Sequence, residues 1–149
     1  MFDAGIHMLY SDHRRYPDFA SLYTPPNTIL NAVDLVLITH FHLDHCGALP
    51  FLTEYHNYSG PVIASTPTKA MIPFMLEDYR KVSTDVRPKE REKEKDKESQ
   101  SEGCYIYSAN EVRASAAKVR GVGLQETLTI AGIKITSYYA GHVLGAVMW

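Results

Sequence analysis

The sequence predicts a layered α/β domain, and two patterns carry this prediction. An apolar run at residues 33–39 is followed at once by a histidine-rich turn, as expected where a buried strand ends in a loop. Further along the chain, short apolar runs alternate with segments of helical periodicity, which is typical of strands flanked by helices. With 149 residues the chain is about the size of one domain.

The first half of the chain contains a long loop, a strand and a helix. Residues 8–28 are rich in Tyr, Pro, Asp and Arg without sustained periodicity, which indicates an irregular loop. Residues 33–39 are mostly aliphatic and predict a strand buried on both faces. Apolar side chains at helical spacing predict a helix over 48–58, and Asn57 and Gly60 mark its end.

The second half continues the alternation of strands and helices. A short strand is predicted at 61–64 and a helix at 66–82. Ser108 and Glu111 have the spacing of a capping box, which predicts a helix over 109–119.

The last part of the chain predicts a β-hairpin that leads to a histidine. Two runs of alternating polarity, at 126–130 and 133–139, flank Ala131 and Gly132, a spacing typical of a tight hairpin. We expect this hairpin to deliver His142 to the end of the sheet.

A charged insertion interrupts the pattern at about residues 83–103. Almost nothing in it is apolar, and its acidic and basic residues alternate and nearly cancel. A solvated, disordered linker is therefore favoured over an RNA-binding arm.

The overall composition excludes several classes of protein. The formal net charge is −2, so bulk charge gives no argument for nucleic-acid binding. Two cysteines, Cys46 and Cys104, and the lack of an apolar leader argue against a secreted disulfide scaffold and favour the cytosol or nucleus. No apolar run approaches the roughly 20 residues that cross a bilayer.

The turn after the 33–39 run has the spacing of a metal site. His40 and His42 alternate at a strand end, so their imidazoles point the same way toward one ion. Asp44 and His45 follow on the turn and face a second ion. Without metal, three crowded imidazoles would repel one another when protonated, so a metal site is favoured over a polar turn that is merely histidine-rich.

Other residues complete this site or are set aside. His142, between Gly141 and Gly145, is the natural third ligand for the first ion. Asp3 either accepts a hydrogen bond from a ligand histidine or caps a turn, and the sequence leaves both open. Packing is favoured over metal binding for Cys46. Three further histidines are expected to be ordinary surface or loop residues: His7, His13 and His56.

These motifs resemble a known family. The segment His-Phe-His-Leu-Asp-His at 40–45 resembles the signature of the metallo-β-lactamase fold, and Cys-Gly-Ala-Leu-Pro at 46–50 is similar to its β-CASP branch of RNA-processing nucleases. The loop at 5–19, with its Tyr-Ser-Asp-His-Arg-Arg segment, resembles the Integrator-type endonucleases more than the pre-mRNA cleavage and polyadenylation endonucleases. The implied fold is α/β, a partial metallo-β-lactamase αββα sandwich over residues 1–149.

The resemblance implies a function and a set of roles. His40, His42 and His142 would hold a first zinc, while Asp44 and His45 would hold a second and act in catalysis, with Asp3 supporting the ligands. The implied protein is a zinc-dependent RNA endonuclease that hydrolyses phosphodiester bonds in small nuclear and nascent RNA. Its implied partners are RNA and other Integrator subunits, including a paralogous metallo-β-lactamase-like subunit. Its implied location is the nucleus, with the cytoplasm as the alternative.

The chain also departs from the family pattern. The family's usual Asp-Cys-Gly has Ala4 at its second position, and the bridging aspartate and the β-CASP domain are not written here. We therefore expect a fragment truncated at both ends, with little or no nuclease activity alone. The alternatives are a cleavage and polyadenylation endonuclease, a non-catalytic scaffold of the same fold, and a small-molecule hydrolase, which the 5–19 loop disfavours.

Overall fold

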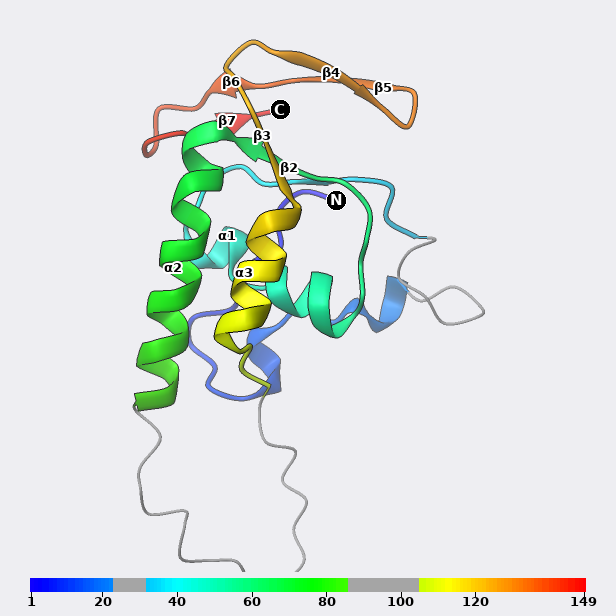
Figure 1. The fold of residues 1–149 in the computed structure, drawn as a ribbon. Helices are drawn as coiled ribbons and strands as arrows, with labels where there is room; N and C mark the ends of the chain where they lie inside the picture. Colours follow the sequence, from blue (N-terminus) through cyan, green and yellow to red (C-terminus); the bar gives the residue numbers. More distant parts are fainter. Residues whose placement is uncertain (23–31, 86–104) are drawn as a thin grey trace, which may run out of the picture.

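A parallel sheet lies at the centre of the molecule. The computed structural model describes residues 1–22, 32–85 and 105–149 (Figure 1). Within them, three parallel strands run in the order β1 (Val36–Leu37), β2 (Val62–Ser65) and β3 (Val119–Val122). Phe2 forms a parallel bridge with Leu37, so the first residues of the chain extend the sheet beyond β1.

Helices cover one face of this sheet. Helices α2 (Thr66–Asp85) and α3 (Ala109–Lys118) lie side by side, and the short α1 (Leu43–Cys46) and the π-helical η4 (Phe51–Tyr55) lie beneath the sheet with them (Figure 1). The main core lies between these helices and the sheet. Its fully buried side chains include Val36, Val62, Leu52, Ile72 and Leu76. No helix in the described part of the chain is both long enough and apolar enough to span a membrane.

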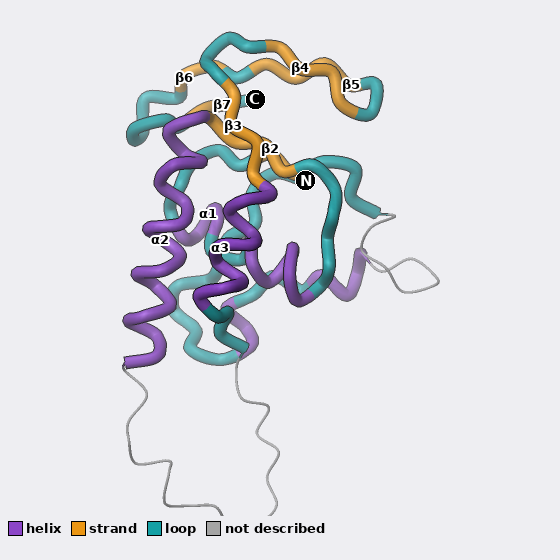
Figure 2. The backbone as a smooth tube through the Cα atoms, in the orientation of Figure 1, coloured by secondary structure: helices purple, strands orange, loops and turns teal. Residues whose placement is uncertain are grey.

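A hairpin covers the opposite face of the sheet. Strands β4 (Thr127–Ile130) and β5 (Ile133–Thr136) pair in antiparallel register and lie on the far side of the sheet from α2 and α3 (Figure 2). A second apolar cluster joins Leu128 and Ile135 to Leu37 and Ile63. The molecule therefore has three layers, in the order helices, sheet and hairpin.

Several elements match the sequence predictions. Helix α3 begins with the predicted capping box, because Ser108 Oγ accepts from Glu111 N at 3.3 Å and Ser108 N donates to Glu111 Oε2 at 2.6 Å. The hairpin turns at Ala131 and Gly132, both with positive φ, as a tight two-residue turn requires. The strand predicted at 61–64 and the helix predicted at 66–82 are also present, each slightly shifted or extended.

Other elements differ from the predictions. Only Val36–Leu37 of the predicted 33–39 strand pairs as a strand, and at Thr39 the backbone N–H donates to the Asp3 carboxylate. The helix predicted over 48–58 is π-helical at its centre, where His56 N donates to Phe51 O.

The end of the predicted hairpin and the charged insertion also differ. Residues 138–139 leave the hairpin at Ser137, whose hydroxyl donates to Gly123 O, and form β6 (Tyr138–Tyr139) paired with β7 (Val147–Met148). Residues 83–85, predicted to belong to the charged insertion, complete helix α2. The rest of the predicted insertion lies outside the described residues, as do residues 23–28 of the irregular loop predicted at 8–28. The described part of that loop contains the short turns η1 (His13–Arg15) and η2 (Phe19–Leu22).

Candidate metal centre

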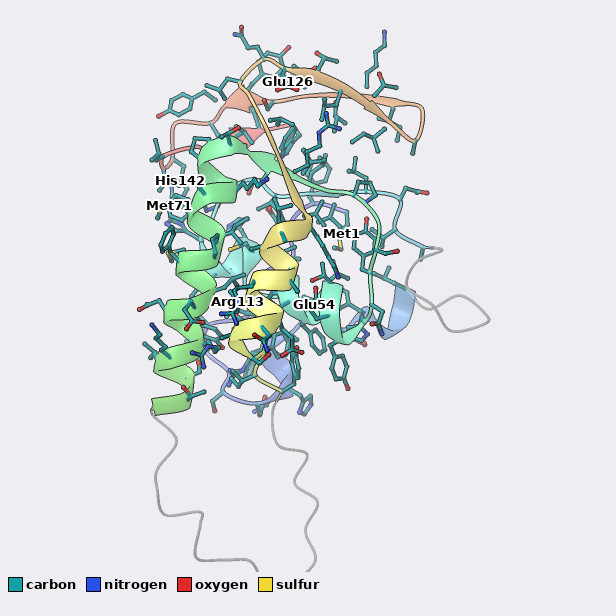
Figure 3. The ribbon with its side chains drawn as sticks, viewed as in Figure 1. Met1, Glu54, Met71, Arg113, Glu126 and His142 are labelled. Atoms are coloured by element: carbon teal, nitrogen blue, oxygen red, sulfur yellow. The ribbon has the colours of Figure 1, made fainter. Side chains whose placement is uncertain are left out.

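Two segments distant in sequence meet just beyond the carboxyl end of β1. His40 and His42 follow this strand directly, and His142 lies in the loop between β6 and β7. Val147 N donates to Thr39 O at 3.0 Å, so β7 brings the His142 loop across the residues that follow β1. Figure 3 shows His142 beside the N-terminal end of α2.

The His142 loop is fixed on the sheet and on helix α2. The Ser65 hydroxyl and the Thr68 hydroxyl both donate to Gly145 O. Gly145 has a φ of +77°, and a Cβ there would lie 2.7 Å from Pro67 Cβ. Only glycine fits this close approach without strain, so Gly145 lets the loop approach α2 and holds His142 at the site.

The three predicted first-ion ligands converge. One ring nitrogen from each of His40, His42 and His142 lies within 4.8 Å of the others. His40 Nε2 is 3.1 Å from His42 Nδ1, and His142 Nε2 is 3.3 Å from the same atom. Nitrogens bound at about 2.0–2.1 Å to a tetrahedral zinc would lie about 3.4 Å apart. Both separations from His42 Nδ1 are therefore close to those of ligands on one zinc-sized ion.

The protonation of His40 also suits metal binding. His40 is buried, and Thr39 Oγ1 lies 3.0 Å from its Nδ1, which leaves Nε2 facing the other imidazoles. Burial, followed by the neighbouring His45 and His42, lowers the pKa of His40. The neutral imidazole that this favours is the form that binds metal.

The predicted second-ion residues lie beside this group. The ring centroids of His45 and His40 are 3.9 Å apart. His45 Nε2 lies 3.6 Å from the Asp44 carboxylate, and 60% of the Asp44 side chain is exposed. The pair thus presents one imidazole nitrogen and one carboxylate on the open side of the site.

The Asp3 carboxylate contacts both Thr39 and His45. Its carboxylate accepts from Thr39 N at 2.7 Å and from Thr39 Oγ1 at 2.9 Å, and its Oδ2 lies 2.8 Å from His45 Nδ1. Of the two roles that the sequence left open, contact with a candidate ligand histidine is the one observed. Sequence reasoning missed Thr39, for which the only signal is its place directly before His40.

The remaining candidates lie apart from this group. Cys46 is fully buried, its thiol donates to Phe41 O at 3.1 Å, and burial raises its pKa, so it packs as predicted. His13 is exposed, His56 packs edge-on against Phe51, and His7 contacts the ring of Tyr10.

Comparisons with known proteins agree with this arrangement. A family model described as a metallo-beta-lactamase superfamily domain matches residues 5–149. The chain is 43% identical over 149 residues to the cleavage and polyadenylation specificity factor subunit 3-II of Arabidopsis thaliana. It is 43% identical over 150 residues to an Integrator complex subunit 11 homolog of Dictyostelium discoideum, and 36% identical over 149 residues to the endoribonuclease ysh1 of Schizosaccharomyces pombe.

These matches cover nearly all of the chain but only part of each relative. They span 99–100% of the chain and 22%, 18% and 17% of the three relatives, so the chain spans about a fifth of their length. Among solved structures, a subclass B3 metallo-β-lactamase from a soil metagenome library aligns with a TM-score of 0.52 at 18% identity, over 98% of the chain and 44% of the enzyme. This likeness confirms the predicted fold.

Proposed function

Because the chain belongs to the metallo-β-lactamase superfamily, we propose that it is the metal-binding part of a zinc-dependent RNA endonuclease. The observation that carries the proposal is the convergence of His40, His42 and His142, whose donor nitrogens have the spacing of ligands to one ion. The resemblance to relatives whose names include endoribonuclease supports RNA as the substrate.

Each residue of the site has a separate task in this proposal. His40, His42 and His142 hold the first zinc, and Asp44 and His45 hold the second. The Asp3 carboxylate is hydrogen-bonded to His45 Nδ1, which leaves His45 Nε2 to bind the second ion. The proposed domain covers residues 1–149, and we assign no chemistry to the charged insertion.

The chemistry is hydrolysis of a phosphodiester bond. Divalent cations at the site would supply positive charge to the phosphoryl oxygens and increase the nucleophilicity of water near neutral pH. The chain's own residues determine where that charge lies. Thr39 and Asp3 contact the Nδ1 atoms of His40 and His45 and orient these rings. The Asp44 side chain is exposed to the solvent from which the RNA approaches.

The relatives suggest where this activity is used. Their names place them in Integrator and in a cleavage and polyadenylation factor. We assign the chain to Integrator-type processing of small nuclear and nascent RNA in the nucleus, with other Integrator subunits, including a paralogous metallo-β-lactamase-like subunit, as partners. A role in cleavage and polyadenylation is the second candidate, because a relative with that name shares the same 43% identity.

The first test is cation binding by the 149-residue chain. Titration of the metal-free chain with Co²⁺ should produce the visible absorption of a tetrahedral nitrogen-ligated ion, and zinc should displace it. His40→Ala should abolish this spectrum, while the matched variant His13→Ala, which removes an exposed histidine away from the site, should retain it. The same spectrum in His40→Ala and in the parent chain would contradict the proposed ligand set.

The second test separates an endonuclease from a scaffold. The protein captured from its own cells together with its bound partners, and loaded with zinc, should cleave labelled single-stranded RNA, and the His40→Ala form should not. Capture of RNA-processing subunits without cleavage, at full zinc occupancy, would favour a non-catalytic scaffold.

A further inference from the structure

An open cleft leads along the first residues of the chain to the metal centre. Its volume is about 840 Å³, and its walls include Asp3, Gly5, His7, Arg14 and Asp44. Asp44 is a proposed ligand of the second ion, so the walls of this cleft include both one residue of the metal centre and the loop that contains His7 and Arg14.

Three side chains of this loop contact one another: the Arg14 guanidinium lies over the Tyr10 ring, and the His7 ring packs against the same ring at an interplanar angle of 44°. The rings of His7 and Tyr10 have centroids 4.7 Å apart, and Arg14 Cζ lies 4.5 Å from the centroid of the Tyr10 ring. His7 and Arg14 line the cleft, and Tyr10 contacts both of them from outside that lining. We call this set, His7, Tyr10 and Arg14, the stacked trio.

The plane of the Arg14 guanidinium is held in place. Arg14 Nε donates to the Asp12 carboxylate at 3.0 Å and Nη2 donates to it at 2.7 Å. Arg14 lowers the pKa of Asp12 to about 2, so the pair is ionised throughout the physiological range. Since 60% of the Arg14 side chain is still exposed, a flat, oriented surface remains open to solvent.

A buried arginine anchors the loop beneath the stacked trio. Arg15 is 6% exposed, and its Nη1 donates to the Tyr79 hydroxyl of α2 at 2.7 Å. Its guanidinium also donates to Ser11 O, and Arg15 O accepts from His7 N at 2.7 Å. The loop is thus already fixed from below, while the exposed Arg14–Asp12 pair contributes little to stability by itself.

From this geometry we infer that the stacked trio is a platform on which a nucleobase of single-stranded RNA stacks as the strand runs along the cleft. Aromatic rings and guanidinium planes are the groups on which unpaired bases stack, and such stacking tolerates any base because every base has a π-face. A platform that is already ordered binds with a smaller loss of side-chain entropy. The inference deepens the proposed function and rests on it for the identity of the strand.

The test is binding of a short fluorescein-labelled oligoadenylate to the 149-residue chain, followed by fluorescence anisotropy in the presence of a chelator. Tyr10→Ala should weaken binding about tenfold, which lies within the range reported for loss of one stacked base. Arg14→Lys, which keeps the charge but removes the plane, should weaken it in the same direction. Phe74→Ala removes an aromatic ring of α2 that is more exposed than Tyr10, 71% against 39%, and should leave binding unchanged.

Several outcomes would overturn the inference. One is that Tyr10→Ala, with its circular dichroism unchanged, binds the oligoadenylate with the affinity of the parent chain, and another is that Phe74→Ala weakens binding as much as Tyr10→Ala does. The others are that the parent chain binds a fully base-paired RNA more tightly than the oligoadenylate, or that it binds no oligoadenylate. The chelator removes any dependence on the metal site, so this result is independent of the Co²⁺ titration. If the chain binds Co²⁺ but Tyr10→Ala does not change RNA binding, only the platform inference is wrong. If the chain does not bind Co²⁺ but Tyr10→Ala weakens RNA binding, only the proposed metal-dependent function is wrong.

Discussion

At the scale of single residues, the site includes a carboxylate that is not itself a proposed zinc ligand. Asp3 has a φ of 55°, a conformation that asparagine and aspartate tolerate better than most residues. In this conformation its two oxygens reach the Thr39 backbone N–H, the Thr39 hydroxyl and the His45 ring together. Because Thr39 Oγ1 also lies 3.0 Å from His40 Nδ1, Asp3 affects the ligands proposed for both ions.

Asp3→Ala is therefore expected to weaken cation binding without removing a ligand. Loss of a carboxylate that orients a ligand histidine costs about 10–100-fold in metal affinity. Competition between the chain and a chromophoric chelator for zinc would measure this change.

The matched control for this substitution is Asp78→Ala, which removes an exposed aspartate from helix α2. It should retain the parental zinc affinity. If Asp3→Ala also retained that affinity while its circular dichroism stayed native, the contact of Asp3 with His45 would have no role in cation binding.

The sequence alone predicted which side chains meet at the site, but it did not predict all of the hydrogen bonds that orient them. The short separation of His40 and His42 in the sequence was enough to predict that they meet, although β1 ends at Leu37, before either residue. The stacked trio and the role of Thr39 were not predicted, because each depends on the path of an aperiodic loop. The ring of Tyr10 meets Arg14 only after η1 has turned the chain, and no periodicity encodes that turn.

At the scale of elements, the approach of the first segment to α1 defines the site. Ala4 N donates to His45 O, Ile6 N donates to Leu43 O, and Ala48 N donates to Ala4 O. These bonds bring the segment that carries Asp3 against the helix that carries Asp44 and His45. Local signals such as the capping box of α3 were readable in the sequence, whereas this contact between distant elements was not.

Gly5→Ala tests how close this approach is. A Cβ at Gly5 would lie 1.6 Å from Asp44 O and 2.2 Å from its carbonyl carbon, and backbone atoms cannot move aside as a flexible side chain can. We expect a loss of several kcal/mol, roughly 3 or more, and the loss of Co²⁺ binding with it. Urea denaturation followed by circular dichroism would measure the stability.

Gly132→Ala is the control for a glycine that needs its backbone conformation but not the space. Gly132 has a φ of +78°, and nothing lies within 4 Å of an added Cβ. Its substitution should cost about 1–2 kcal/mol and leave Co²⁺ binding intact. Equal costs at the two positions would show that the segment and α1 can separate without damage to the site.

At the scale of the whole molecule, the metal centre joins parts of the chain that are distant in sequence. Asp3, the turn at residues 40–45 and His142 lie at positions far apart in the sequence of 149 residues. The strands that carry them are short: β1, β6 and β7 have two residues each. An ion bound by His40, His42 and His142 would therefore act as a cross-link between the sheet and the last segment of the chain.

Zinc should accordingly stabilise the whole fold. A ligand at a hundred times its Kd adds about 2.7 kcal/mol if it binds only the folded state, which for a chain of this size raises the Tm by about 5–10 °C. Calorimetry of the chain with zinc and with excess chelator would measure the difference. His13→Ala should show the full shift and His40→Ala should lose it. A Tm that does not respond to zinc in the parent chain would mean that the three imidazoles do not bind one ion together, because binding confined to the folded state cannot leave its stability unchanged.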